Sequence, residues 1–262
     1  MPIVTLLSDF GLQDGYVACM KGVILGIAPE VDLVDVSHLI APQDVRSAGF
    51  VLFTAYRYFP PGTVHLAVVD PGVGTERKAI AVRTESGFFV GPDNGIFSLV
   101  LKNEAGFEAR NLENADFQLR PLSSTFHGRD LFAPAAAHIA RGAPFDLLGP
   151  ETAPMIAQWS SPVRGKSGIE GEIIHIDRFG NCITNVTLQE IAKVHPASAW
   201  RVKAGQGPEL PLYDTYSRVQ PGNALALAGS SGFVEIAVNR GNAALNLGLR
   251  TGTAVYFLLQ RA

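Results

Sequence analysis

The sequence has few cysteines and no long apolar run, and both absences restrict what the protein can be. Cys19 and Cys182 are the only cysteines among 262 residues. Two thiols so far apart are too few for a disulfide framework or a cysteine zinc site, and they fit a reducing cytoplasm. No apolar run reaches the roughly 18 residues of a membrane helix, and the N-terminus "MPIVTLLSDFG" lacks the cationic start of an export signal. We therefore expect a cytoplasmic protein that has no membrane segment and is not exported.

Charge is also sparse in this chain. Asp, Glu, Lys and Arg together make up 17 % of the residues and leave a net charge of −3. Lysine and arginine are scattered without forming a basic run, so nucleic acid is not an expected partner. Hydrophobic residues, in contrast, reach 47 %. That content argues against disorder and for one large or two smaller folded domains.

The first half of the chain alternates apolar runs with segments of helical spacing. Three runs rich in leucine and β-branched residues are predicted strands: residues 2–8, 32–37 and 63–69. The segments between them carry apolar residues at three- and four-residue steps and are predicted helices: Asp14 to about Ile27, and 44–59 with Asp44 as the N-cap. Further strands are predicted at 78–84 and 87–91, and a later helix at 131–142. Such alternation predicts a mostly parallel sheet flanked by helices.

A stretch rich in proline, glycine and serine separates this pattern from a second one. Beyond it, short strand-like runs follow one another with turn residues between them: 169–177, 181–187, 224–229, 232–239 and 253–259. Strands spaced in this way predict a small β domain, partly closed into a barrel. We therefore expect an α/β protein with an N-terminal α/β domain at 1–150, a linker at 151–168 and a C-terminal β-barrel-like domain at 169–262.

Acidic residues lie at the carboxyl ends of the first three predicted strands: Asp9, Asp35 and Asp70. Ligands of parallel α/β sheets bind outside the carboxyl ends of the strands, so we expect these acids at one edge of the sheet. Each acid alone could simply cap a loop or a helix. Three together favour a site. The turn "DPGVG" that begins at Asp70 lacks the spacing of a nucleotide-phosphate loop.

His127 lies next to a glycine in "STFHGRD", residues 124–130, just before a predicted helix. Its side chain is expected to reach the same sheet edge, although a histidine at a helix start can also serve only to bond a nearby carbonyl. The segment "GPDNG", residues 91–95, is first of all a turn, and its backbone could line the pocket.

The second predicted domain holds an acid, an aromatic and an amide within a few residues, in "IDRFGNCITN". Asp177, Phe179 and Asn181 are the three groups that a zwitterionic small molecule with an aromatic part would require. A hairpin turn would produce much of the same sequence. Ser230 and Glu235 are possible polar contacts in "GSSGFVEIAVNRGNAA", residues 229–244.

Six segments together resemble the S-adenosylmethionine hydroxide adenosyltransferase family: "SDFG", "VVDPGVGTER", "GPDNG", "STFHGRD", "IDRFGN" and "SSGFVEIAVNRGNAA". This family is the hydrolase branch of the superfamily that also contains the adenosyl chloride and fluoride synthases. The resemblance covers essentially the whole chain in order. It implies an N-terminal α/β domain, a C-terminal β-barrel-like domain and a homotrimer whose sites lie between the first domain of one subunit and the second domain of its neighbour.

The resemblance also implies a role for individual residues. The water-handling triad falls on Asp70, Arg77 and His127, the ribose-binding acid on Asp9, and the acid that holds the methionine ammonium on Asp177. The remaining substrate contacts fall on Phe179, Asn181, Ser230, Glu235 and Val238. The implied reaction converts water and S-adenosyl-L-methionine to adenosine and L-methionine, with attack on the ribose 5′ carbon. S-adenosyl-L-methionine is then the substrate, and neither a cofactor nor a metal is required.

The chemistry of water limits what the triad can do. The pKa of bulk water lies about 12 above that of a free aspartate, which corresponds to roughly 16 kcal/mol, so Asp70 cannot hold hydroxide in advance. Two arrangements remain open. Arg77 stabilises developing hydroxide while His127 takes the proton, or proton transfer to Asp70 is concerted with attack on carbon.

Three other functions also remain open. A halogenase would form 5′-halo-5′-deoxyadenosine, and Gly128 matches the glycine that the chloride synthase carries beside its halide pocket. A metal-dependent hydrolase would use the carboxylate and imidazole groups near the strand ends: Asp9, Asp14, Asp35, His38 and Asp70. A non-catalytic nucleoside-binding protein would use the same pocket without turnover.

Overall fold

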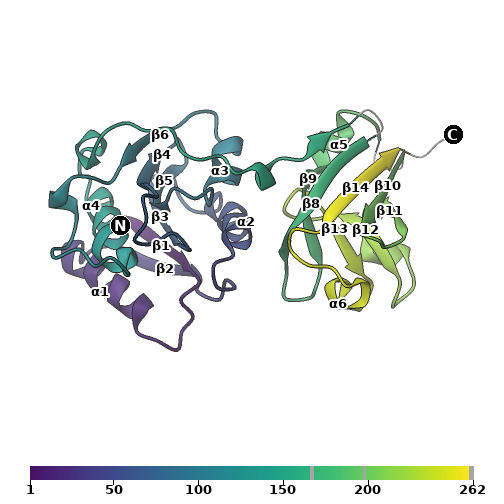
Figure 1. Ribbon diagram of the computed structural model, residues 1–262, viewed down its shortest axis with the longest axis horizontal. Coiled ribbons are helices and arrows are strands. Elements are labelled where there is room, and N and C mark those ends of the chain that lie inside the picture. The colour runs from purple at the N-terminus through teal and green to yellow at the C-terminus, as the bar shows by residue number, and fades with distance from the viewer. Residues whose placement is uncertain (166–167, 197–198, 260–262) are drawn as a thin grey trace. The chain divides into compact units, whose positions relative to one another are not determined.

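The computed structural model describes residues 1–165, 168–196 and 199–259. The chain forms two compact units, Met1–Ala157 and Gln158–Ala262 (Figure 1). The division lies within the segment 151–168, and each unit has a sheet of its own. The mixed α/β fold that the sequence predicts is confirmed.

A six-stranded sheet forms the centre of the first unit, in the order β2-β1-β3-β5-β4-β6. Its strands are β1 (Ile3–Ser8), β2 (Asp32–Ser37), β3 (Thr63–Val68), β4 (Ala79–Arg83), β5 (Gly87–Pro92) and β6 (Glu108–Asn111). The pairs β1–β2, β1–β3 and β3–β5 are parallel, whereas β4 runs antiparallel to both β5 and β6. Residues 84–86, which join β4 to β5, are too short for the crossover that a parallel pair needs. This part of the sheet is therefore antiparallel.

Four α-helices accompany this sheet: α1 (Tyr16–Ile27), α2 (Val45–Tyr56), α3 (Ser98–Asn103) and α4 (Ala133–Ala140). Helix α2 begins as expected, because a side-chain oxygen of Asp44 accepts a hydrogen bond from the backbone N–H of Ser47 at 3.0 Å. Helix α4 covers only part of the predicted span 131–142. The chain before it, Gly128–Phe132, is wound as a wider π-helical turn.

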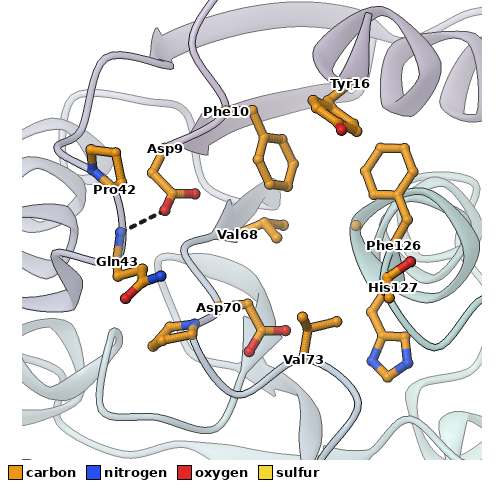
Figure 2. A pocket seen from close by; sticks show the side chains of 13 residues that line it. Asp9, Phe10, Tyr16, Pro42, Gln43, Val68, Asp70, Val73, Phe126 and His127 are labelled. Carbon is orange, nitrogen blue, oxygen red and sulfur yellow. Dashed lines mark hydrogen bonds between the residues drawn. The ribbon is translucent and has the colours of Figure 1, made fainter. Parts of the chain in front are cut away.

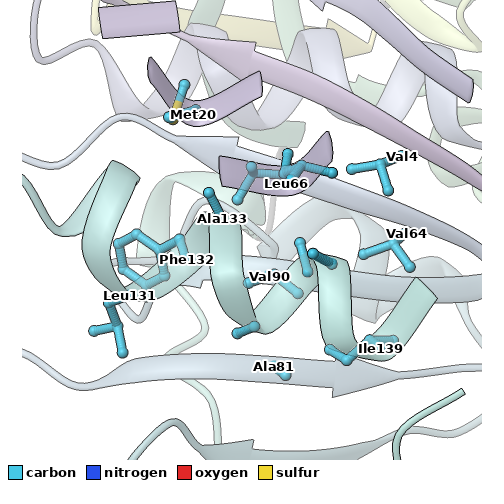
Figure 3. Close-up of a cluster of buried hydrophobic side chains, with 14 of the residues drawn as sticks. Val4, Met20, Val64, Leu66, Ala81, Val90, Leu131, Phe132, Ala133 and Ile139 are labelled. Carbon is cyan, nitrogen blue, oxygen red and sulfur yellow. The ribbon is translucent and has the colours of Figure 1, made fainter. Parts of the chain in front are cut away.

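The core of the first unit follows the alternation of side chains along the strands. Val64 and Leu66 of β3 belong to a buried cluster that includes Phe132 and residues of α1 and α4 (Figure 3). The side chain between them on β3, His65, instead contacts Tyr56 of α2, with ring centroids 6.2 Å apart. Helices therefore pack on both faces of the sheet.

The stretch that the sequence marks as a linker has more structure than its composition suggests. The backbone N–H of Met155 donates to Asp93 at 2.7 Å, and that of Ala157 donates to the Ser98 hydroxyl at 2.9 Å. Further along, β7 (Val163–Arg164) pairs with the strand that follows it. Backbone polar groups in this stretch are thus satisfied by specific partners, which composition alone does not reveal.

The second unit contains a closed ring of seven strands within its described residues. The strands are β8 (Gly168–Ile176), β9 (Cys182–Thr187), β10 (Trp200–Ala204), β11 (Glu209–Tyr213), β12 (Ala224–Ala228), β13 (Phe233–Val238) and β14 (Ala254–Leu259). Their order is β14-β10-β11-β12-β13-β9-β8, and the pairing of β14 with β8 closes the ring. Two short α-helices, α5 (Leu188–Ala192) and α6 (Ala243–Leu247), also lie among the described residues of this unit.

Strands β10 and β11 were not among the predicted strands. Both are short, and Pro211 interrupts β11, so neither has the apolar run that marks its neighbours. Trp200 and Val202 are nevertheless fully buried in the barrel core, together with Phe257 of β14. In the part of the chain that the structure describes, no helix is both long and apolar enough to span a bilayer.

Candidate functional site

A cavity of about 390 Å³ lies at the carboxyl ends of β1 and β3 in the first unit (Figure 2). It is lined by Asp9, Phe10, Tyr16, Pro42, Gln43, Val68, Asp70, Pro71, Val73, Thr125, Phe126, His127 and Gly128. Asp9 directly follows β1, and Asp70 lies two residues after the end of β3. His127 directly precedes the π-helical turn. The structure thus brings three of the predicted residues to one cavity.

Asp70, Arg77 and His127 are joined by one guanidinium group. Arg77 Nε donates to both carboxylate oxygens of Asp70, at 2.9 and 3.0 Å, and Nη2 donates to Oδ2. The same Nη2 also donates to His127 Nδ1 at 2.8 Å. The side chains of Arg77 and Asp70 are only 10 % and 7 % exposed. Asp70 and His127 line the cavity, whereas Arg77 links them from outside its lining.

This contact decides which nitrogen of His127 carries the ring proton. A guanidinium can only donate, so Nδ1 must accept and the neutral ring carries its proton on Nε2. Burial lowers the pKa of His127, and the positive charge of Arg77 lowers it further, against the opposing effect of Asp70 and Asp130. The imidazole is therefore neutral near pH 7 and presents a donor.

The glycine turn after β3 explains how the triad is assembled. Gly74 has φ of +79°, and a Cβ at this position would lie 2.7 Å from the carbonyl oxygen of Ser124. Only glycine accepts that conformation and that close approach at little cost. The turn therefore packs directly against the segment 124–130, which carries His127.

Asp9 is held by a residue that the sequence did not indicate. Its Oδ2 accepts a hydrogen bond from the backbone N–H of Gln43 at 2.8 Å (Figure 2). Gln43 has φ of +66°, a left-handed conformation that is unusual for a residue other than glycine. Such strained residues often occur at functional sites.

Three aromatic rings on the cavity wall also escaped sequence reasoning. Phe10, Tyr16 and Phe126 contact one another, with ring centroids 5.1 to 5.8 Å apart. Two of them had a signal, because Phe10 lies inside "SDFG" and Phe126 inside "STFHGRD", whereas Tyr16 lies outside the motifs. They form an apolar wall beside the polar groups of Asp9 and Asp70.

Two of the sequence candidates near this edge do not line the cavity. Asp35 instead pairs with Lys21 Nζ at 2.7 Å and with His38 Nε2 at 3.0 Å. The "GPDNG" turn does not line the cavity but contacts the segment that leads to Asp70: the Asn94 amide donates to the carbonyl of Val69 at 2.8 Å. That contact holds the peptide that precedes Asp70.

The residues proposed for a metal-dependent hydrolase are not assembled as ligands. Within the described ranges, no group of three or more His, Cys, Asp or Glu side chains is arranged to hold a metal ion. Asp35 and His38 bond to each other, and Asp9 bonds to a backbone N–H. The geometry gives no support to that alternative.

Asp177 organises the candidate loop of the second unit. Its Oδ1 accepts from the backbone N–H groups of Phe179 and Asn181, at 2.9 and 2.8 Å, and its Oδ2 accepts from the Asn181 amide at 2.9 Å. Gly180 is at φ of +83°, and an added Cβ would lie 2.1 Å from the side chain of Asn242. This tight turn leaves the ring of Phe179 75 % exposed.

A second cavity, of about 470 Å³, lies beside this loop within the second unit. It is lined by Phe179, Asn181, Tyr216, Val238, Arg240 and Gly241. Sequence reasoning missed Tyr216 and Arg240. Tyr216 gave little signal because it stands outside the quoted motifs, whereas Arg240 lies within "SSGFVEIAVNRGNAA".

Glu235 contacts the lining residue Tyr216, but neither Glu235 nor Ser230 lines the second cavity. Glu235 is largely buried, and the Tyr216 hydroxyl donates to it over a long 3.5 Å. Burial raises the pKa of Glu235, as does the nearby charge of Asp177, while the Tyr216 hydrogen bond opposes the shift. Ser230 is exposed in the turn between β12 and β13.

Family comparison covers both units. Residues 4–149 match the family model for the SAM hydroxide adenosyltransferase N-terminal domain, and residues 171–256 match that for the C-terminal domain. An (R)-S-adenosyl-L-methionine hydrolase of Thermus thermophilus is 43 % identical over 97 % of this chain and 99 % of its own. A hydrolase of the same name from Salinispora tropica is 39 % identical, over 96 % and 95 % of the two chains.

A solved structure and a more distant relative are also similar to this chain. An uncharacterized conserved protein of Thermotoga maritima superposes with a TM-score of 0.86 at 37 % identity, covering 97 % of this chain and 99 % of that one. A fluorinase of Nocardia brasiliensis is 27 % identical over 97 % of this chain and 96 % of its own. The hydrolases are thus more similar to this chain than the fluorinase is. With both of its domain models matched in order, the chain belongs to the SAM hydroxide adenosyltransferase family.

Proposed function

We propose that this protein hydrolyses S-adenosyl-L-methionine to adenosine and L-methionine. The observation that carries the proposal is the guanidinium of Arg77, which joins a buried carboxylate, Asp70, to an imidazole, His127, at the wall of a cavity. Relatives that are 43 % and 39 % identical over nearly the whole chain are named (R)-S-adenosyl-L-methionine hydrolases. The reaction is an in-line attack of water oxygen on the ribose 5′ carbon, with the neutral thioether of methionine as leaving group.

The triad serves the nucleophile, because a neutral thioether needs no acid to depart. A water molecule beside the triad donates a hydrogen bond to Asp70 and accepts one from Nε2–H of His127, which leaves one lone pair for the carbon. His127 cannot take the proton in this arrangement, since Nε2 already carries one and Nδ1 accepts from Arg77. Of the two mechanisms that the sequence left open, the geometry favours proton transfer to Asp70 in concert with attack.

Burial of the triad assists this step. A partly formed hydroxide that meets a sulfonium loses charge on the way to the transition state, and a low dielectric favours that loss. Arg77 lies over the ring of Phe132, with its guanidinium carbon 5.2 Å from the ring centroid. That contact keeps the guanidinium in a dry environment, where its stabilisation of negative charge is strongest.

The remaining candidate residues are proposed to hold the substrate. Asp9 binds the ribose hydroxyls, and Asp177 binds the methionine ammonium. Phe179 and Asn181 contact the adenine and the sugar. Ser230, Glu235 and the backbone at Val238 complete the contacts. No cofactor or metal takes part in this scheme, and the two free thiols, Cys19 and Cys182, suit a protein of the reducing cytoplasm.

We also propose a homotrimer, in which the first domain of one subunit, 1–150, and the second domain of its neighbour, 169–262, share each site. Exposed apolar side chains beside both half-sites support it. Leu12 and Leu39 are 69 % and 74 % exposed, on loops that a hydrogen bond from Gly11 N–H to the His38 carbonyl holds together. Leu245 is 79 % exposed beside the loop of Phe179. Contact between subunits at these positions would remove apolar side chains from water.

Two inactive variants test the shared site. Asp70→Ala and Asp177→Ala are expected to be inactive alone, because one lacks a triad member and the other a substrate contact. When the two are unfolded together and refolded in equal amounts, random assembly leaves about a quarter of shared sites with both parts intact. Recovery of about that fraction of activity supports the proposal. A mixture as inactive as its components would contradict it.

The central experiment follows the oxygen atom. The purified protein is incubated with S-adenosyl-L-methionine in oxygen-18 water, with and without chloride, bromide or iodide, and the nucleoside is analysed by mass spectrometry. Label in the adenosine 5′-hydroxyl is the expected result. A 5′-halo-5′-deoxyadenosine as the main product would establish the halogenase instead. Substrate that calorimetry shows to be bound and that stays intact would favour a binding protein.

A further inference from the structure

A chain of hydrogen bonds runs from the surface of the first unit to the wall of its cavity. Asp35 Oδ1 bonds to His38 Nε2 at 3.0 Å, and His38 Nδ1 bonds to the Ser8 hydroxyl at 2.7 Å. The same hydroxyl accepts from the backbone N–H of Phe10 at 3.3 Å. Ser8 is fully buried and His38 is 4 % exposed, while the Asp35 side chain is 41 % exposed.

With a neutral imidazole, the hydrogen bonds that join Asp35, His38 and Ser8 have only one possible assignment of donors and acceptors. Burial acts to raise the pKa of Asp35, but hydrogen bonds from Lys21 and His38 outweigh it and lower the pKa, so Asp35 is a carboxylate that only accepts. His38 Nε2–H therefore donates to Asp35, and Nδ1 is left to accept from the Ser8 hydroxyl. The Ser8 oxygen is then free to accept from Phe10.

These residue types are those of a Ser–His–Asp hydrolase, but they do not act as one here. Ser8 has no exposed surface, so no substrate carbonyl can reach its hydroxyl oxygen. That oxygen is also bonded on both sides, to His38 and to the N–H of Phe10. A nucleophile must be able to approach its substrate. The arrangement is instead suited to holding a backbone segment.

We infer that Asp35, His38 and Ser8 form a positioning relay for the peptide that joins Asp9 to Phe10. The N–H at the end of the relay belongs to this peptide, whose two residues both line the cavity. The backbone carbonyl of His38 also accepts from Gly11 N–H at 2.8 Å, so His38 holds the turn at two points. The relay thereby sets where the Asp9 carboxylate and the Phe10 ring meet the substrate, although none of its three members lines the cavity.

This inference rests on the proposed function, because it takes Asp9 to be a ribose contact. It predicts that substrate affinity depends on the acceptor at position 35 and not on the charge there. Asp35→Asn retains an oxygen that accepts from His38 Nε2–H, so the order of protons is kept. Asp35→Ala removes the acceptor, and His38 is then free to adopt the other tautomer, which cannot accept from Ser8. Both variants lose the ion pair with Lys21 equally.

The test measures the KM for S-adenosyl-L-methionine, kcat, and the Kd for adenosine by calorimetry. For Asp35→Ala, KM and Kd are expected to rise about three- to tenfold, the effect of one hydrogen bond, while kcat stays within about twofold. For Asp35→Asn all three values are expected to stay near those of the native chain. Equal values in the two variants would overturn the relay.

A second pair of variants separates positioning from stability. Ser8→Ala removes the member of the relay that accepts from the Phe10 N–H and is expected to raise KM and Kd as Asp35→Ala does. Thr5→Val is its control, because the Thr5 hydroxyl bonds to His65 Nδ1 at 2.8 Å on the same strand, also buried, and neither residue lines the cavity. The control should lower the unfolding temperature without changing KM. If Ser8→Ala does no more than the control, the inference is wrong.

Asp9→Ala, measured in the same assays, shows whether a negative result concerns the relay alone or the proposed ribose contact. A raised Kd for adenosine in Asp9→Ala, with unchanged values in all relay variants, refutes the relay alone. An unchanged Kd in Asp9→Ala refutes the ribose contact itself. If Ser8→Ala does not fold, the Asp35 pair still decides, since that side chain is partly exposed.

Discussion

Replacing Arg77 by lysine tests the centre of the proposed mechanism. Arg77 makes its contacts through a planar fork: Nε and Nη2 both donate to Asp70, and Nη2 also donates to His127 at 2.8 Å. Lysine retains the charge but has a single nitrogen on a flexible stem, so it cannot occupy both positions of the fork. Lysine still compensates the charge of Asp70, but the hydrogen bonds that connect Asp70 to His127 through one side chain are lost.

The magnitude follows from the number of hydrogen bonds that disappear. A hydrogen bond to a charged group contributes about 1.5–3 kcal/mol, and lysine forfeits at least two of the contacts that Arg77 makes. If these contacts act in the transition state, the barrier rises by about 3–6 kcal/mol and kcat falls by about 10²–10⁴. KM is expected to change little, because Arg77 is not a lining residue of the cavity.

Initial rates of adenosine formation, measured by chromatography over a range of substrate concentrations, separate kcat from KM. Arg83→Lys serves as the matched control, since Arg83 pairs with Glu108 on the same sheet but is 50 % exposed. Exposed ion pairs contribute at most about 1 kcal/mol, so this variant should keep its kcat. A folded Arg77→Lys protein that retained kcat within about threefold would refute the reasoning.

Three further predictions concern stability. Burial lowers the pKa of His65 to about 4, so the unfolded chain binds more protons than the native one below about pH 6.5. The free energy of unfolding should therefore fall by about 3 kcal/mol between pH 6.5 and 4. Urea unfolding of the native chain and of His65→Leu at several pH values checks this, and the same pH dependence in both proteins would contradict it. Burial and the charge of Asp177 raise the pKa of Glu235, so the native protein loses stability as pH rises through that pKa. Glu235→Gln should therefore raise the unfolding temperature near pH 8 more than near pH 4, and an equal change at both would count against it. Gly180→Ala places a Cβ 2.1 Å from a neighbouring side chain at a left-handed φ and should lower the free energy of unfolding by about 1–3 kcal/mol. Gly22→Ala has open space in α1 and should raise the free energy of unfolding by about 0.5–1 kcal/mol. Urea denaturation of both variants measures the two effects.

Much of the first unit could be predicted because its signals are local. The N-cap at Asp44 depends on a side chain and an N–H three residues away, and it is where the sequence placed it. The alternation of apolar strands with helical spacing is likewise a property of short windows. Placing Asp9 and Asp70 at one cavity required only the rule that parallel strands end at the same edge.

Other features could not be predicted because they depend on segments far apart in the chain. Asp35 also lies near the carboxyl end of a parallel strand, β2, yet it bonds to Lys21 and His38 and stays outside the cavity. Gln43 reaches Asp9 from a loop, through a backbone N–H that every residue but proline possesses. In the barrel, β10 and β11 lack a continuous apolar run, and pairing with their neighbours places them in the sheet.

By itself, then, the sequence determined the α/β and β-rich halves of the chain and its family, since periodicity, turn chemistry and motifs lie within a few residues of one another. The tertiary structure alone decided the state of the groups in the candidate site. The contact between Arg77 and His127 joins residues 50 positions apart and settles which nitrogen of the ring carries the proton. A hydrogen bond has a direction that both partners must share, and the partner of His127 is set by how the glycine turn at Gly74 packs against Ser124.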